Sequence, residues 1–277
     1  MKKKTPGIKK RVERNSFFYI GLILCLLLTL LTLLGTFWTP CSPTAMSGAA
    51  KLQSPSAAHL LGTDNLGRDI FSRVLKGAGA SVLIAVCVVA VGTFFGTLIG
   101  SFCGYYGGAA DLILTRVCDT ITAFPSVLLA LVVISLIGGG TLNLILVLGI
   151  LFIPSFARVV RTEVARARVQ NYVISARLMG AGDLRIIFLH ILPNILPVLA
   201  PAMIIGFNNA VLSEAGMSFL GIGILPPQIS LGAMLSDSQN YLRSAPWYAL
   251  SAGCSIALII LSVSLLGEGL QQSKRRN

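Results

Sequence analysis

Residues whose types and spacing could do chemistry are few in this chain of 277 residues. Its two histidines, His59 and His190, lack a second metal ligand at a spacing such as H-E-x-x-H. Its six cysteines form no C-x-x-C pair, so we expect small apolar packing residues, not a zinc site or a disulfide framework. Ser218 lies in a segment without the closing glycine of a nucleophile elbow, and a P-loop is absent. The sequence therefore predicts no catalytic residue, bound metal or cofactor.

The most informative polar stretch is the basic island from Arg158 to His190. It holds six arginines and only two acids, Glu163 and Asp183. The segments on either side, 120–157 and 191–213, carry no formal charge. Because positive loops between membrane segments stay in the cytoplasm, we expect the island to face inward.

The island is itself predicted to be structured. Residues 172–180 and 183–191 are each expected to form a short helix, with Asp183 as the N-cap of the second and a glycine turn between them. Pro193 then marks the entry to the next apolar run. Such a knob, carried on two membrane helices, could transmit a push from a soluble motor. A solvated basic loop without a partner is the alternative.

Composition places these elements in a membrane. The chain is 55% hydrophobic and 12% charged, with a mean hydropathy of +0.82, whereas soluble domains carry about 25% charged residues. The net charge of +12 could suggest nucleic acid. The basic residues instead cluster at the ends of apolar runs, where they meet lipid headgroups, so no nucleic-acid partner is expected.

The predicted fold class is all-α, a polytopic membrane protein with six transmembrane helices, because each span needs about 20 apolar residues. One long run breaks at Gly138–Gly140 and so supplies two of these helices. The period-2 alternation of a membrane barrel is absent. The predicted spans are 16–38, 80–103, two within 120–157, 191–213 and about 247–267.

The orientation follows from the basic residues. With both termini in the cytoplasm, the inner segments hold seventeen lysines and arginines and the outer loops, 39–79 and 214–246, hold five. The first span is longer than a signal-peptide core of about 7–15 residues, so cleavage is the less favoured alternative. We divide the chain into residues 1–79, with the tail, first helix and external loop, and residues 80–277, a five-helix core that carries the coupling loop 158–190.

A glycine row marks the second span, with one glycine every four residues along one helix face. Such a row lets another backbone approach closely. We favour packing within the bundle over a subunit interface. The helix-packing residues are Gly92, Gly96, Gly100 and Gly104.

The outer loops carry further signals. We expect a short amphipathic helix over 66–76, capped by Thr63 or Asp64. Pro226–Pro227 predicts an irregular last outer loop. The acids nearest to the spans are placed at span ends, where a charge costs little. They are Asp119, Glu214 and Glu268.

Residues 172–194 resemble the coupling-loop motif of ABC-importer permeases, E-A-A-x-x-x-G followed further on by I-x-L-P. The motif's glutamate is replaced by Ile174 and its first alanine by Ser175, so the acid that the motif offers to the ATPase is missing here. The resemblance implies an ATPase-coupling role for Tyr172, Ile174, Ser175, Ala176, Gly180, Asp183, Leu192 and Pro193.

The chain also resembles the C-type permeases of the dipeptide, oligopeptide and nickel branch over about residues 10–270. Two positions depart from that branch: Leu231 stands where tryptophan is usual, and Glu268 replaces an aspartate. The matching segments are 59–69, 104–108, 123–125, 218–223, 226–227 and 266–270.

This resemblance implies the type I importer fold and a non-catalytic subunit of the bacterial inner membrane. The expected partners are a B-type permease in a heterodimer, two cytoplasmic ABC ATPases and an extracytoplasmic solute-binding protein. Peptide import is the favoured function, and nickel or metal-chelate uptake is the alternative. An intramembrane enzyme or a self-sufficient secondary carrier is a distant third.

Overall fold

The computed structural model describes the backbone of residues 7–274 and the side chains of residues 18–269. Within these ranges the regular structure is helical, with one isolated bridge between Thr63 and Asp69. The described chain forms two compact units, residues up to Ile84 with 139–141 and 211 onward, and residues 85–138 with 142–210. The division into 1–79 and 80–277 stays a prediction. Five of the basic residues counted on the inner side, Lys2, Lys3, Lys4, Arg275 and Arg276, lie outside the described residues.

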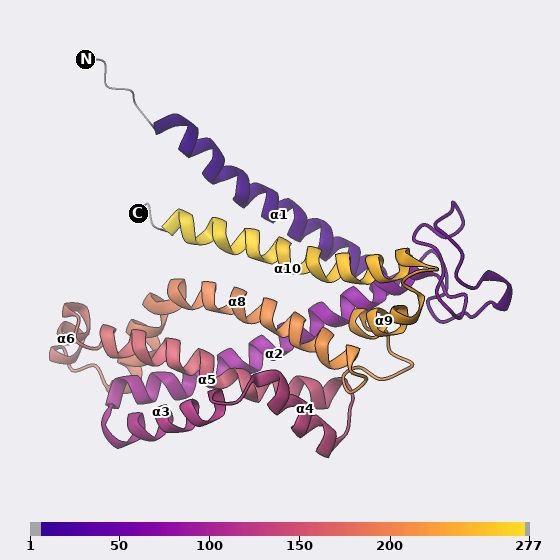
Figure 1. Cartoon of the computed structure of the whole chain (residues 1–277). Coiled ribbons are helices and arrows are strands. Elements are labelled where there is room, and N and C mark those ends of the chain that lie inside the picture. Colours follow the sequence, from indigo (N-terminus) through magenta and orange to yellow (C-terminus); the bar gives the residue numbers. More distant parts are fainter. Residues whose placement is uncertain (1–6, 275–277) are drawn as a thin grey trace, which may run out of the picture. The chain divides into compact units, whose positions relative to one another are not determined.

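The first unit pairs the helices nearest to the two ends of the chain. Helix α1 (Gly7–Phe37) runs alongside α10 (Pro246–Lys274), as Figure 1 shows. A Cβ at Gly21 would come within 2.5 Å of the backbone nitrogen of Leu266, so glycine sets this close approach. The same unit contains the 3₁₀ turns Gly48–Ala50 and Gln239–Tyr241 and helix α9 (Leu231–Ser238).

The second unit is a helix bundle. It contains α3 (Gly108–Thr122), α4 (Ser126–Ile137) and most of α5 (Thr141–Ala167). Two long helices pass from one unit into the other, α2 (Ile70–Tyr106) and α8 (Leu192–Phe219).

The all-α membrane fold is confirmed. Five described helices are long and apolar enough to cross a membrane, and the pair α3 and α4, bent by 84°, supplies a sixth span if it counts as one. The chain turns at Ala123–Pro125 because Pro125 cannot continue a helix from the residues before it. The predicted break at 138–140 is also confirmed, and Gly138 and Gly140 adopt positive φ there.

The predicted amphipathic helix over 66–76 is wrong as a separate element, because α2 begins at Ile70 and continues without a break. Its cap is also different. The carboxylate of Asp69 accepts the backbone N–H of Ser72 at 2.8 Å, as an N-cap does. Asp64 instead folds the preceding turn, where its carboxylate accepts the N–H groups of Leu66 and Arg68, each at 2.9 Å.

The predicted outer loop 214–246 is wrong at its start. Helix α8 continues to Phe219, and Glu214 is fully buried rather than at a polar span end. Its carboxylate accepts hydroxyl hydrogen bonds from Ser81 at 2.6 Å, Ser218 at 2.8 Å and Ser230 at 2.9 Å. Three donors satisfy the buried oxygens, so the helix does not need to end there. The irregular segment at Pro226–Pro227 is as predicted, since residues 220–230 form no helix.

The glycine row of α2 lies against α5 in the second unit. A Cβ at Gly96 would stand 2.7 Å from the Cβ of Phe156, and one at Gly100 would stand 2.5 Å from the carbonyl oxygen of Ala157. A Cβ at Gly104 would meet the carbonyl oxygen of Arg161, also at 2.5 Å. The backbones of the two helices therefore approach closely along this row, within the chain itself.

Candidate functional site

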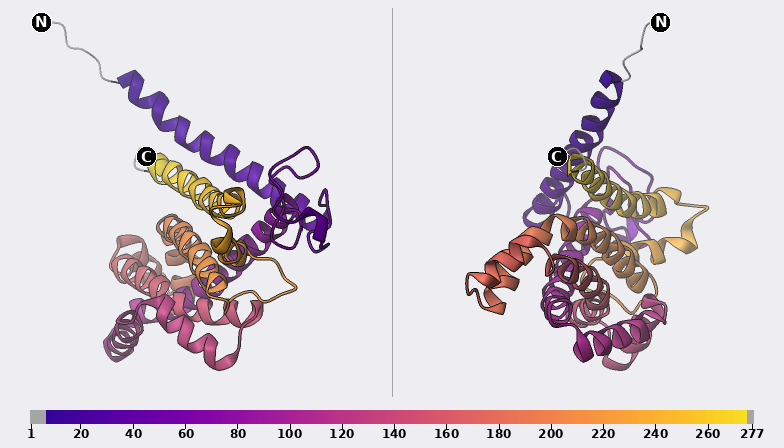
Figure 2. Two further views of the ribbon diagram at one scale, coloured as in Figure 1. Left: turned by 45° about the vertical axis from the view of Figure 1, so that its right-hand side comes forward. Right: turned by 90° about the vertical axis from the view of Figure 1, so that its left-hand side faces the viewer.

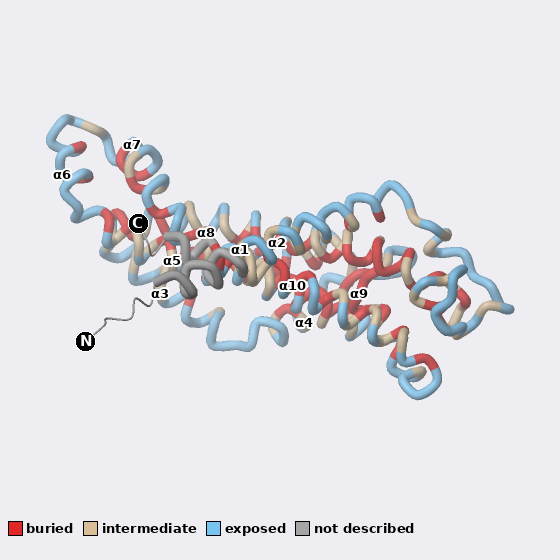
Figure 3. The backbone as a smooth tube through the Cα atoms, turned by 90° about the horizontal axis from the view of Figure 1, so that it is seen from above, coloured by how far each residue is buried: buried red, intermediate tan, exposed pale blue. Residues whose placement is uncertain are grey.

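A short helix, α6 (Asn171–Leu178), projects from the second unit beyond the ends of α5 and α8 (Figure 2). It belongs to the basic island and most of it is exposed (Figure 3). After a turn, the chain returns through α7 (Asp183–Arg185) and a π-helical segment, Ile186–Ile191, into α8. We call residues 171–191 the projecting segment.

One face of α6 fixes it to the segment that follows. Val173 is completely buried and Ala176 is 3% exposed, three residues apart and therefore on the same face. Opposite them the π-helical segment buries Ile186, Ile187 and Ile191 completely. The apolar contact between two consecutive short helices makes the projecting segment a packed unit rather than a free loop.

The turn between the two helices has the geometry of a Schellman motif. Gly180 has φ of +83°, its N–H donates to the carbonyl of Arg177, and the N–H of Ala181 donates to the carbonyl of Ala176, both at 3.0 Å. A residue with a Cβ is strained at this backbone conformation. The glycine that the sequence identified thus ends α6 and reverses the chain.

Tyr105, at the end of α2, ties the projecting segment to the bundle. Its hydroxyl donates to Asp183 Oδ1 at 2.7 Å and accepts from Arg177 Nη2 at 2.8 Å, so it bonds to both sides of the glycine turn. The Arg177 guanidinium also lies 5.7 Å from the centre of the Tyr105 ring. Arg168 adds a 2.9 Å hydrogen bond to the Tyr105 carbonyl. In the sequence Tyr105 stands out only as part of a matching segment, and this role is not visible there because its partners lie more than sixty residues away.

An ion pair strengthens the bundle beneath the segment. The guanidinium of Arg161 on α5 makes two hydrogen bonds to the carboxylate of Asp111 on α3, and the Nη2 to Oδ2 bond is 2.5 Å. Such bidentate pairs fix both distance and direction. By contrast, Arg158 and Asp119 form a more exposed pair at 3.2 Å.

The prediction that 183–191 is a separate helix is wrong. Asp183 is the first residue of α7, not its N-cap, and its side chain bonds to Tyr105 instead of the helix backbone. The helix then runs on into α8. Pro193 lacks the N–H for an i→i−4 bond, and the π-helical segment just before it shifts the register, as at other π-bulges. The continuous helix connects the projecting segment directly to a membrane span.

The outward face of the segment is apolar. Leu178 and Met179 are 83% and 82% exposed, and Leu184 is 57% exposed. These side chains form an apolar tip around the glycine turn. Exposed apolar side chains on a rigid projection are typical of a protein docking surface.

The structure places the predicted coupling residues on the two sides of this segment. Tyr172, Ile174 and Ser175 are exposed on α6, and Leu192 and Pro193 begin α8. Partial desolvation raises the pKa of Tyr172, so its phenol remains neutral at physiological pH. Ile174, which stands in the place of the motif's glutamate, is 46% exposed and offers an apolar contact instead of a charge.

Comparison with known proteins gives a consistent result. The family described as binding-protein-dependent transport system inner membrane component matches residues 96–276. The dipeptide transport system permease protein of Alkalihalophilus pseudofirmus is 36% identical, over 95% of this chain and 87% of the relative. Its counterpart in Haemophilus influenzae is 37% identical, over 94% and 90%. The glutathione transport system permease protein of Pectobacterium atrosepticum is 40% identical, over 80% and 73%.

Proposed function

The chain belongs to the family of binding-protein-dependent transport system inner membrane components, and we propose that it is one of two permease subunits of an ATP-driven peptide importer. It would form the translocation path together with a B-type permease. It would couple that path to two cytoplasmic ABC ATPases and receive peptide from an extracytoplasmic solute-binding protein.

The observation that carries this proposal is the anchored projecting segment. Its apolar tip is exposed, while Tyr105 ties it to the bundle and the Val173 face packs α6 against the π-helical segment. Its return helix is continuous with α8. A displacement applied at the tip would therefore move a membrane-crossing helix instead of being lost in a flexible loop.

The orientation supports this assignment. The projecting segment and both termini belong on the cytoplasmic side, where the basic residues concentrate and where ATP is available. The loop between α1 and α2 and the region around α9 then face outward and would receive the binding protein.

For the substrate, short peptides are favoured over nickel. The relatives named above are permeases for dipeptide or glutathione. A deletion strain complemented with this chain should regain uptake of a labelled dipeptide, while its Ni²⁺ uptake stays unchanged. The reverse result would assign the chain to metal uptake.

Coupling is tested with a matched pair of leucines. Leu178 at the tip and Leu136 at the end of α4 are 83% and 82% exposed. Leu178→Ala should lower ATP-driven uptake several-fold at an unchanged membrane level, and Leu136→Ala should leave it near wild type. A photo-reactive residue at position 178 should cross-link to the ATPase. Normal uptake by Leu178→Ala, together with adducts to lipid alone, would overturn the proposed coupling surface.

A further inference from the structure

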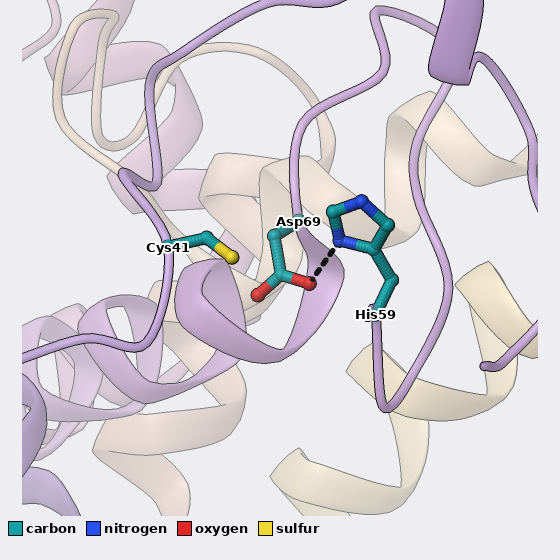
Figure 4. Close-up of side chains that lie close together, drawn as sticks. All are labelled: Cys41, His59 and Asp69. Carbon is teal, nitrogen blue, oxygen red and sulfur yellow. Dashed lines mark hydrogen bonds and ion pairs between the residues drawn. The ribbon is translucent and has the colours of Figure 1, made fainter. Parts of the chain in front are cut away.

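Three side chains with different metal-ligand atoms meet in the first unit, within the loop region before α2. The sulfur of Cys41, a ring nitrogen of His59 and a carboxylate oxygen of Asp69 all lie within 4.8 Å of one another. Figure 4 shows the carboxylate lying between the sulfur and the imidazole ring. In the described part of the chain this is the single group of this kind. No short sequence motif predicts this group, because the ligands are spread over residues 41 to 69.

Backbone contacts hold each of the three residues in place. Asp69 caps α2 with Oδ2, which leaves Oδ1 free to face His59 Nδ1 at 2.9 Å. The carbonyl of His59 accepts the N–H groups of Ser56 at 2.9 Å and of Gly62 at 2.8 Å. The N–H of Cys41 donates to the Oγ of Ser72, in the first turn of α2, at 3.1 Å. The ligand atoms are thus brought together by contacts that involve no ion.

Cys41 has no part in the hydrogen bond between His59 and Asp69. The His59–Asp69 pair alone would tie the loop to α2, as many such pairs do. The other cysteines lie within helices α1, α2, α3 and α10, whereas Cys41 lies in the loop. It is partly exposed, as is His59, while the side chain of Asp69 is 4% exposed. An ion could therefore reach the group from solvent while one ligand stays fixed in a buried position.

We propose that Cys41, His59 and Asp69 bind a divalent ion of the zinc type. Thiolate, imidazole and carboxylate are the ligands that Zn²⁺ takes in proteins, and three protein ligands leave one position for water or a solute. Zinc-to-ligand distances of about 2.0–2.3 Å place donor atoms roughly 3–4 Å apart. Donors within 4.8 Å of one another need to close by no more than about 1–2 Å, and the 2.9 Å pair of His59 and Asp69 needs to open slightly, which side-chain rotations supply.

Charge and protons balance in this site. On binding, the thiol of Cys41 releases its proton to solvent. The proton that Nδ1 of His59 donates to Asp69 leaves that nitrogen, and the neutral ring carries its one proton on Nε2, so that Nδ1 can ligate. The thiolate and the carboxylate of Asp69 then neutralise the two charges of the ion. The ion replaces the His59–Asp69 hydrogen bond with bonds that also join Cys41. It would therefore fasten the chain just after α1 to the start of α2, on the side proposed to meet the binding protein.

Binding is measured directly on the full chain, purified in detergent with its partner permease. Zn²⁺ is titrated in competition with a chromophoric chelator, and Co²⁺ is added separately to detect a thiolate-to-metal charge-transfer band. We expect one Zn²⁺ per chain and a Co²⁺ band. Cys41→Ser and His59→Gln should each weaken Zn²⁺ binding by more than about tenfold, since even the loss of an outer-shell partner costs about 10–100-fold. Asp69→Asn, which keeps the helix cap, should do the same.

Cys254→Ser is the matched control, because Cys254 is an exposed cysteine on α10 outside the group. It should bind Zn²⁺ like the wild type. A second measurement uses a variant that keeps Cys41 as its single cysteine, in which Zn²⁺ but not Mg²⁺ should slow alkylation of the thiol. The proposal is overturned if the wild-type chain binds no stoichiometric Zn²⁺, or if Cys41→Ser and Cys254→Ser bind equally well. Neither readout depends on transport, so the proposed function is tested separately.

Discussion

The hydroxyl of Tyr105 donates a 2.7 Å hydrogen bond to Asp183, the first residue of α7. The same hydroxyl accepts a bond from Arg177 on α6, so one phenol at the end of α2 holds both sides of the projecting segment. Because the side chains of Asp183 and Arg177 are exposed, the buried tyrosine is the fixed point of this network.

Tyr105→Phe should loosen the projecting segment without unfolding the bundle. The ring remains and both hydroxyl bonds are lost, at a cost of about 1–2 kcal/mol. Hydrogen exchange in residues 171–191 should become about fivefold faster or more, since about 1 kcal/mol corresponds to that factor. Uptake per ATP hydrolysed should fall with it. Tyr106→Phe, at a neighbouring exposed tyrosine, is the control. Equal exchange in the two variants would contradict the role of Tyr105.

The turn at Gly180 offers a test with a control two residues away. Gly180 has φ of +83°, whereas Gly182 has φ of −69°, and a Cβ meets nothing within 4 Å at either position. Gly180→Ala should therefore cost about 1–2 kcal/mol through backbone strain alone. Gly182→Ala should be close to neutral. ATP-driven uptake and hydrogen exchange of the α6 amides measure the difference. If Gly180→Ala shows the same uptake and exchange as the wild type, the turn is ruled out as a functional element.

The glycine row on α2 predicts a steric effect within the membrane. Gly100→Ala would place a Cβ 2.5 Å from the carbonyl of Ala157, a backbone atom that cannot move aside without shifting α5. We expect a loss of about 1–3 kcal/mol, the usual cost of overpacking. Gly216→Ala is the control, because a Cβ meets nothing within 4 Å at that helical glycine. It should be neutral or stabilise by up to about 1 kcal/mol. Thermal unfolding in detergent compares the two, and equal melting temperatures would be evidence against the close contact.

Glu214 should be essential for the stability of the first unit. Glu214→Ala leaves the hydroxyls of Ser81, Ser218 and Ser230 without their shared acceptor in a buried site, at about 1–3 kcal/mol for each unsatisfied group. Glu214→Gln keeps one carbonyl oxygen and should lose less. Glu163→Ala is the control, since Glu163 pairs with Arg166, whose side chain is 67% exposed, and exposed pairs are worth about 0–1 kcal/mol. Protein yield and thermal unfolding should rank wild type and Glu163→Ala first, Glu214→Gln next and Glu214→Ala last.

Several elements of this fold could be read directly from local sequence. The apolar runs predicted the membrane-crossing helices, because a span must bury every backbone polar group within its own helix. The glycines at 138–140 and Gly180 predicted chain breaks, because positive φ is a property of the residue itself. The apolar face of α6 was less visible, since a helix of eight residues carries little periodicity.

Other predictions made from local sequence were wrong, and the reason can be identified. Helix α8 continues past Glu214, and the side chain of Asp183 does not cap the helix that it begins. In both cases a distant group satisfies the carboxylate, Ser81 and Ser230 for Glu214 and Tyr105 for Asp183. Local capping rules cannot include partners that lie many residues away along the chain.

The sequence by itself determined that this chain crosses a membrane several times, that a basic island interrupts its spans and that glycines define its turns and its closest helix contacts. These properties depend on the hydropathy, charge and backbone freedom of neighbouring residues. The tertiary structure alone decided that Tyr105 anchors the projecting segment, that Glu214 is buried among serines and that Cys41 meets His59 and Asp69. Each of these is a contact between polar side chains far apart in sequence, and only the folded chain brings them within bonding distance.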